Sequence, residues 1–280
     1  MRERWFWFAM TTTLTWGVWG ALIEVPEKHG VPAPLGYAIW ALTMIPCAWI
    51  ALRRRGGPIE RDRRSVIVCA TGGLLGAGGQ LVLFEALRLA PAYIVFPIVS
   101  LYPALTIMLS VAFLRERAPR RQWAGIVLSL PAIGLISLQG GDAKVSGYVW
   151  LVLATIVFVM WGAQACVLKL ATKTVSAEGV FAYMAGTAVA FIPVSLAMTD
   201  FSAVSWQWTG PEAAIQVLNA IGALTLVFAL REGKAIVVVP LTSLAPVITI
   251  ILSLALYGRA PLPEQGIGMV LAAIAIYLVA

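Results

Sequence analysis

The feature that most limits what this chain can fold into is a series of ten apolar runs separated by short polar breaks. Each run is about 18–24 residues long, and a helix of that length crosses the hydrocarbon core of a bilayer, which is about 30 Å thick. The runs cover residues 5–23, 33–52, 66–87, 91–114, 121–138, 147–168, 178–198, 212–230, 234–256 and 263–280. We therefore expect an all-α integral membrane protein with ten transmembrane helices.

Composition and charge agree with membrane insertion. Hydrophobic residues make up 60% of the chain and charged residues only 12%, which is too little polar surface for a soluble protein of 280 residues. With the N-terminus inside, sixteen of the 20 Lys and Arg residues fall on the cytoplasmic side and four on the outer side. This bias predicts a multi-pass protein of the cytoplasmic membrane with both termini in the cytoplasm. The lipid bilayer therefore explains the net charge of +7, and no nucleic-acid partner is expected.

One stretch of the chain occurs twice. Residues 86–110 align without a gap on residues 229–253 at an offset of 143, and about half of the positions carry the same residue. The Trp-Gly pair at Trp16 has a counterpart at Trp161, at an offset of 145. The chain thus consists of two matched halves.

Each half contains five of the apolar runs. We place the first half at residues 1–140 and the second at residues 141–280. Because five is an odd number, the second half must enter the membrane in the opposite sense to the first. Two inverted five-helix repeats in one membrane domain are the architecture of secondary transporters, whose binding site lies between the repeats near the midplane.

Within the repeated stretch, small polar residues and prolines recur every three or four positions. Ser100, Pro103, Thr106 and Ser110 fall within an arc of about 120° if the stretch is one helix. The second copy keeps these residue types at the equivalent positions. We expect two matched helices that turn a weakly polar stripe toward a central space. The alternative is that the small hydroxyl residues serve close helix packing.

Candidate substrate-binding residues are the polar and aromatic side chains near the middle of the runs, because buried amide and indole groups need partners that a polar cavity supplies. The alternative for the aromatic residues is packing between helices or an interfacial belt. The candidates are Trp16, Trp19, Gln80, Ser100, Tyr102, Trp161, Gln164, Asn219 and Ser243.

Two acids lie near the outer ends of their runs and are candidates for coupling transport to an ion. Glu24 and Glu85 each suit three roles: a solvated rim residue, a partner of a base such as Arg88, or a proton or cation site. Metal and cofactor sites are not expected, because His29 is the only histidine and the three cysteines lack metal-ligand spacing.

The residues that follow the first repeated stretch resemble a known family. The run LYPALTIMLSVAFLRERAPRRQWAGIVLSLPAIGLISL, residues 101–138, looks like the end of an EamA domain of the drug/metabolite transporter superfamily. It has a proline-containing span, an Arg-Glu-Arg turn at 115–117 and a Gln-Trp-x-Gly start at 122–125. The resemblance covers essentially the whole chain as two tandem EamA repeats. It implies a ten-helix carrier for a small organic metabolite, often an exporter. We interpret Glu116, in the Arg-Glu-Arg turn, as a loop residue that supports the helix junction.

Two classes of function can be weighed at this point. The first is a secondary-active or facilitative carrier that moves an amino acid-, sugar- or amine-like solute by alternating access. A homodimer is compatible with such a carrier, although the sequence does not determine the oligomeric state. The alternative is a membrane-embedded enzyme acting on a lipid or polyprenyl substrate. Such chemistry generally needs clustered carboxylates, a histidine pair or metal ligands, whereas the thirteen acids here are scattered. We therefore predict a transporter and not an enzyme.

Overall fold

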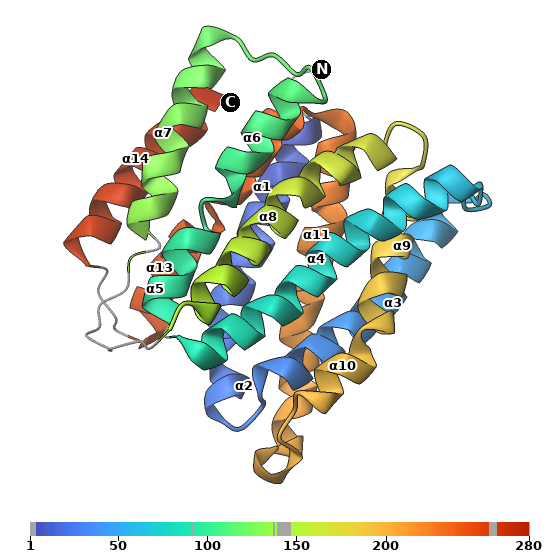
Figure 1. The fold of residues 1–280 in the computed structure, drawn as a ribbon, viewed down its shortest axis with the longest axis vertical. Helices are drawn as coiled ribbons and strands as arrows, with labels where there is room; N and C mark the ends of the chain where they lie inside the picture. Colours follow the sequence, from blue (N-terminus) through green and yellow to red (C-terminus); the bar gives the residue numbers. More distant parts are fainter. Residues whose placement is uncertain (1–3, 91, 137, 139–146, 258–261, 280) are drawn as a thin grey trace.

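The structure, a computed structural model, describes residues 4–90, 92–136, 138, 147–257 and 262–279. Within these ranges every regular element is a helix (Figure 1). The α-helices are α1 (Arg4–Leu22), α2 (Glu24–Lys28), α3 (Ala33–Arg55), α4 (Arg63–Leu89), α5 (Ala92–Val99), α6 (Tyr102–Ala112), α7 (Arg120–Ile136), α8 (Val149–Ala171), α9 (Ala177–Ala190), α10 (Ile192–Ala197), α11 (Thr209–Glu232), α12 (Ala235–Thr242), α13 (Ala245–Tyr257) and α14 (Pro263–Val279). Two short 3-10 helices, η1 (Phe201–Ala203) and η2 (Trp206–Trp208), precede α11.

The helices follow the apolar runs of the sequence. Six helical segments are long and apolar enough to cross a bilayer, and they are Ala33–Arg55, Arg63–Leu89, Val149–Ala171, Ala177–Ala197, Trp206–Glu232 and Ala235–Leu256. The remaining four runs coincide with α1, with α5 and α6, with α7 and with α14. The chain is therefore an all-helical, multi-pass membrane protein.

The two copies of the repeated stretch are not single helices, and this corrects the expectation of one continuous polar stripe. The first copy breaks between α5 and α6, where Ser100 lies, and the second breaks between α12 and α13, where Ser243 lies. The prolines explain the position of both breaks. A proline ring clashes with the carbonyl group four residues earlier. For Pro103 and Pro246 those residues are the last helical residues before each break, Val99 and Thr242.

Capping side chains set where two of the long helices begin. Asp62 accepts a hydrogen bond from the backbone N–H of Ser65 (3.0 Å) at the start of α4. Ser176 does the same for Gly179 (3.2 Å) at the start of α9. Such caps satisfy backbone donors that the first turn of a helix leaves open. Both helices consequently start in polar connections outside the apolar runs.

Helices from the two halves pack against each other throughout the molecule. In Figure 1, α4 runs beside α8 and α1 runs beside α11, while α7 and α14 form one edge and α3 and α9 the opposite one. The halves therefore share one core and do not form separate globular units. The predicted boundary between residues 140 and 141 lies outside the described residues.

Equivalent helices of the two halves run in opposite directions. Trp5, at the start of α1, packs against Gly233, just after the end of α11. Lys169, at the end of α8, donates hydrogen bonds to the carbonyl oxygens of Leu230 and Gly233 (2.6 Å each). The start of α1 and the end of its counterpart α8 thus lie at the same end of the molecule.

Candidate functional site

Two tryptophans, one in each half, make equivalent contacts with a helix of the other half. Trp16 of α1 donates its indole N–H to the carbonyl oxygen of Asn219 on α11 (3.3 Å). Trp161 of α8 donates to the carbonyl oxygen of Gly76 on α4 (3.3 Å). Because residues 76 and 219 are separated by the repeat offset of 143, the two contacts are related by the internal repeat.

Close helix approach next to these tryptophans depends on matched glycines. Thr106 donates its hydroxyl group to the carbonyl oxygen of Gly162 (2.9 Å), and Thr249 donates to that of Gly17 (2.9 Å). Each glycine follows one of the two tryptophans in the sequence. A Cβ atom on either glycine would lie under 3 Å from a side chain of the facing helix. The repeat thus preserves the contact geometry as well as the order of the helices.

The two helix breaks meet between the halves. The hydroxyl groups of Tyr102, at the start of α6, and Ser243, in the α12–α13 break, lie 2.8 Å apart. The ring of Tyr102 also makes an edge contact with Trp161, at 6.0 Å between centroids. Three predicted candidates are thus together. Ser100 is half-buried in the other break. Non-helical backbone at membrane depth is tolerated where it is buried in protein or lines a cavity.

On the first-half side of this centre, α4 presents glycines to α8. A Cβ atom on Gly76 would lie 2.1 Å from the amide nitrogen of Gln164, and one on Gly79 would lie 2.6 Å from the indole nitrogen of Trp161. The candidate Gln164 thus packs directly against the backbone of α4. Gln80, the next residue on α4, is half-buried, and its amide has no hydrogen bond within the described part of the chain.

On the second-half side, the equivalent face carries a chain of polar side chains. Trp19 donates its indole N–H to the amide oxygen of Gln216 (3.0 Å), and the Asn219 amide approaches the same oxygen (3.4 Å). The Gln216 amide nitrogen in turn donates to Oε1 of Glu212 (2.8 Å). Two predicted candidates, Trp19 and Asn219, therefore belong to a network whose other members sequence reasoning missed.

A signal for the missed residues is present in the sequence. Glu212, Gln216 and Asn219 are spaced four and three residues apart, which places them on one face of a helix. Glu212 stands at the first position of its apolar run and therefore has the appearance of a boundary residue. In the structure α11 begins three residues earlier, at Thr209, and Glu212 is only 1% exposed.

One oxygen of the Glu212 carboxyl group is unsatisfied. Its Oε2 atom is buried and has no hydrogen-bond partner among the described residues. A buried unpaired carboxylate costs several kcal/mol, whereas a neutral carboxyl group with one unmade hydrogen bond costs about 1–3 kcal/mol. The neutral, protonated form is accordingly the form that this environment favours.

The two predicted coupling acids each have a basic partner on their own helix. Glu24 pairs with Lys28 (2.8 Å) in α2, and Glu85 pairs with Arg88 (2.7 Å) in α4. These pairs are partly exposed, and such pairs contribute about 0–1 kcal/mol to stability. Both acids lie outside the network around Gln216.

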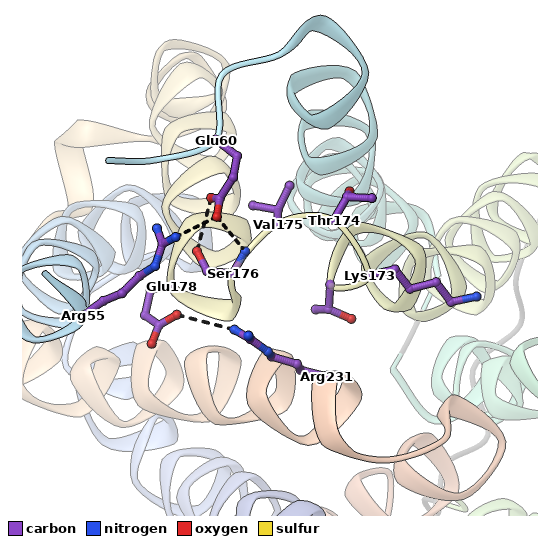
Figure 2. A pocket seen from close by; sticks show the side chains of 9 residues that line it. Arg55, Glu60, Lys173, Thr174, Val175, Ser176, Glu178 and Arg231 are labelled. Atoms are coloured by element: carbon purple, nitrogen blue, oxygen red, sulfur yellow. Dashed lines mark hydrogen bonds and ion pairs between the residues drawn. The ribbon is translucent and has the colours of Figure 1, made fainter. Parts of the chain in front are cut away.

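A polar pocket of about 370 Å³ opens at the end of the molecule where α8 and α11 finish. Figure 2 shows Glu60 between Arg55 (2.7 Å) and Ser176, and Glu178 facing Arg231 (3.9 Å). Partial burial raises the pKa of Glu60, but hydrogen bonds from its own backbone and Ser176 and the charge of Arg55 outweigh this and lower it. These contacts join the α3–α4 connection, the start of α9 and the end of α11.

Glu116 connects the two halves near the same end. Its carboxylate accepts hydrogen bonds from the backbone N–H groups of Ala235 (3.1 Å) and Ile236 (2.9 Å), in the first turn of α12. Lys234 donates to the carbonyl oxygen of Arg117 beside it. An acid at a helix N-terminus is favoured by the open N–H groups and the helix dipole. The turn glutamate therefore supports a helix junction, as the sequence indicates.

Taken together, the fold and the site define a multi-pass helical membrane protein with matched halves, paired helix breaks and aromatic and amide side chains between the halves. Broken helices of this kind, in corresponding positions of two halves, are characteristic of secondary transporters. The chain belongs to the EamA-like transporter family, whose sequence profile matches residues 3–138 and 146–280.

The chain is similar to known proteins in sequence and in fold. A probable terminal-alkyne amino-acid exporter of Streptantibioticus cattleyicolor is 26% identical over 158 residues, which is 54% of this chain and 50% of the exporter. An uncharacterized protein of Methanocaldococcus jannaschii is 45% identical over 96 residues, or 34% of this chain and 69% of that protein. A solved crystal structure aligns over 99% of this chain and 96% of its own, with a TM-score of 0.82 and 21% identity. The match to the exporter thus spans half of its length, and the crystal structure shows the shared fold.

Proposed function

We propose that this protein is a secondary-active or facilitative carrier that exports a small organic metabolite by alternating access between two inverted five-helix repeats, with ten membrane crossings. The observation that carries the proposal is the meeting of the two helix breaks at Tyr102 and Ser243 (2.8 Å). Each break ends a helix in one half and exposes polar groups toward the other half. A relative movement of the halves would part or rejoin this contact and open the centre to one side at a time.

The chemistry around the breaks favours a neutral or zwitterionic solute such as an amino acid. Hydroxyl groups of Ser100, Tyr102 and Ser243 and the amides of Gln80, Gln164 and Asn219 are hydrogen-bonding partners for carboxylate, amine or hydroxyl groups. The indoles of Trp16, Trp19 and Trp161 supply flat apolar walls that suit sugars and amines as well. The partial similarity to a probable amino-acid exporter supports an amino acid as the solute.

The distribution of charge supports an orientation with both termini in the cytoplasm. Arg55, Lys173 and Arg231 line the polar pocket at the end where α8 and α11 finish, which is also the end where α1 starts. Basic residues favour the cytoplasmic side of a membrane. On this orientation the pocket, with both signs of charge, receives the solute from the cytoplasm. A homodimer in the cytoplasmic membrane remains a prediction.

Transport by the purified protein in liposomes tests the proposal. We expect exchange of radiolabelled amino acids, sugars or amines, confined to one chemical class. Ser243→Ala and Tyr102→Phe should each slow the exchange about tenfold if each removes one hydrogen bond of about 1–1.5 kcal/mol to the solute. Thr155→Val is the matched control, because this hydroxyl group is on an exposed part of α8 and, among the described residues, bonds only to Leu151 of its own helix.

The outcomes separate the carrier from the site within it. Protein-free rates for every class of solute would contradict the carrier. Exchange at the wild-type rate in both Ser243→Ala and Tyr102→Phe would contradict the placement of the site at the breaks. The membrane enzyme considered from the sequence is disfavoured by membership of a transporter family.

A further inference from the structure

Glu212 occupies a position that neither helix packing nor solute binding at the breaks explains. It lies in the first turn of α11, it is 1% exposed, and its Oε2 atom has no hydrogen-bond partner among the described residues. The equivalent position of the first half, 143 residues earlier, is Cys69, which is a small, weakly polar residue. The acid is therefore a feature of one half only.

The helix α3 covers this carboxyl group. A Cβ atom on Gly36 would lie 2.6 Å from Oε1 of Glu212 and 3.6 Å from the amide nitrogen of Gln216. One turn further along α3, on the same face, the indole nitrogen of Trp40 is also buried without a partner in the described part of the chain. Two unsatisfied polar groups thus lie along one helix interface, although buried polar groups are normally paired.

The end of the molecule at which α11 begins is closed by contacts between residues 29–30 and residues 205–208, two segments distant in sequence. The backbone N–H of Ser205 donates to the carbonyl oxygen of Gly30 (2.9 Å). The ring of His29 stacks on Trp208, with 4.0 Å between centroids. Trp208 directly precedes α11, so a movement that parts these contacts would bring water to the first turn of that helix.

The charged and titratable groups near Glu212 come from the elements around the start of α11. Among the described residues no Lys, Arg or His nitrogen forms an ion pair with Glu212. Lys28 pairs with Glu24, and the Tyr37 hydroxyl group donates to Ala188. On α2 and α3, which pack against α11, and on the segments next to them, the charged and titratable groups are Glu24, Glu27, Lys28, His29, Tyr37 and, before η1, Asp200.

We propose that Glu212 is a proton-binding site that controls opening of the end of the protein at which α11 begins. In the proposed orientation this is the outer end. With the outer end closed, the carboxyl group is protonated and neutral. When Ser205 and Trp208 move away from Gly30 and His29, water reaches Glu212, its O–H bond breaks, and the proton passes to the outer solution and leaves a carboxylate. An ionised Glu212 cannot be reburied without cost, so deprotonation favours the open state by linkage. Proton binding is independent of the proposed transport function, and only its coupling to a solute rests on it.

The first experiment follows the outer end directly and needs no substrate. Spin labels at Lys28→Cys and Gln207→Cys, in a background in which the half-buried Cys47 is replaced by Ser, report the separation of the two segments in lipid nanodiscs. The pH is raised from about 5 to about 9, a range that spans the pKa values of ordinary and strongly shifted carboxyl groups. In the protein that keeps Glu212, we expect the fraction of molecules with a long distance between the two labels to increase as the pH rises. Glu212→Gln, which is permanently neutral, should stay closed at every pH.

Glu27→Gln is the matched control, because it removes the neighbouring acid on α2 whose pKa, about 7, also lies in this pH range, and it leaves Glu212 in place. We expect this variant to open with pH as the parent protein does. The proposal is overturned if Glu212→Gln also opens with pH, or if Glu27→Gln abolishes the response.

A second measurement does not depend on whether Glu212→Gln folds. In the Glu27→Gln protein labelled with ¹³C at glutamate carboxyl groups, one glutamate should remain protonated at about pH 7, well above the ordinary range of an exposed glutamate. Finding every glutamate ionised at that pH overturns the proposal. Neither readout uses a solute, so a failure of the transport assay and a failure of proton binding are distinguishable.

Discussion

The interface between α4 and α8 and the interface between α1 and α11 share one backbone plan but differ in chemistry. In both, a tryptophan N–H donates to a backbone carbonyl oxygen of the facing helix at 3.3 Å. The glycine after each tryptophan accepts a threonine hydroxyl group at 2.9 Å from a third helix, α6 or α13. The facing helix then differs at three equivalent positions, which are Cys69, Gly73 and Gly76 on α4 and Glu212, Gln216 and Asn219 on α11.

This comparison teaches which parts of a repeated fold must stay alike. Close approach of helix backbones requires the glycine after each tryptophan, Gly17 and Gly162, and both halves keep the threonine that bonds to it. The helix that accepts the tryptophan N–H is less constrained in residue type, because this contact uses its backbone carbonyl group and not its side chain. The second half uses that freedom to place an acid and two amides where the first half has glycines and a cysteine, so polar function is concentrated on one side of a nearly symmetric scaffold.

The largest effect should follow from placing the acid of one half into the other. Cys69→Glu puts a carboxyl group at a site on α4 that is 0% exposed, without the glutamine that supports Glu212. We expect a loss of about 3 kcal/mol or more in the free energy of unfolding. Cys69→Gln is the control for size, and thermal unfolding in detergent is the measurement. If Cys69→Glu and Cys69→Gln are equally stable at neutral pH, α4 tolerates a buried acid as α11 does, and the predicted difference between the two helices is wrong.

An intermediate effect should distinguish the two glycine contacts. A Cβ atom on Gly17 would lie 2.3 Å from Cβ of Ile248 and 2.9 Å from the backbone oxygen of Ala245, whereas the three atoms nearest to one on Gly162 all belong to the Leu105 side chain, at 2.7–2.9 Å. Overpacking typically costs about 1–3 kcal/mol, so we expect Gly17→Ala near the upper value and Gly162→Ala near the lower.

Gly186→Ala provides the control for these two variants. Gly186 lies inside α9, and a Cβ atom there would have no neighbour within 4 Å. Because alanine favours helix by about 1 kcal/mol over glycine, this substitution should be neutral or stabilising in the same unfolding assay. A larger loss for Gly162→Ala than for Gly17→Ala would show that the two interfaces are less alike than their hydrogen bonds indicate.

The smallest effect concerns the acids around α11. Although Glu27 is partly exposed, desolvation of its carboxyl group, with added repulsion from the neighbouring acid Glu24, raises its pKa from 4.5 to about 7. The folded state therefore binds more protons than the unfolded state between these values, so stability falls as the pH rises from 4.5 to about 7 and then levels off.

Glu27→Gln should remove this decline. The shift corresponds to about 3 kcal/mol in full, and screening at an exposed position should reduce the gain at pH 8 to about 1 kcal/mol. Unfolding midpoints measured across this pH range provide the test. Parallel stability curves for the two proteins would contradict an interaction between Glu27 and the acids around it.

Much of the fold could be predicted from the chain because its signals are local. Apolar runs, turn residues and the positive-inside bias each act within one span or loop. The breaks at Ser100 and Ser243 were missed although their cause, Pro103 and Pro246, is present in the repeated stretch. The hydrophobicity of each stretch continues through the break and hides the interruption of its backbone hydrogen bonds.

The candidate residues were predicted with mixed outcome. The sequence points to Trp16, Trp161 and Tyr102, which take part in the contacts between the halves. Their role in binding a solute stays a prediction. Glu212 and Gln216 were missed because, in the sequence, an acid at the edge of an apolar run looks the same as a residue in the adjoining loop. Whether such an acid is buried depends on the helices packed around the start of its own helix.

The class of protein, the two matched halves and the residues able to interrupt a helix follow from the amino-acid sequence alone, since hydropathy, repeat offset and proline chemistry need no partner in space. Only the tertiary structure decided that Glu212 is buried under Gly36, that Gln216 joins it to Trp19, and that the two breaks touch at Tyr102 and Ser243. The physical reason is that burial and hydrogen bonding of a membrane helix are set by neighbouring helices, and here those neighbours lie far away along the chain.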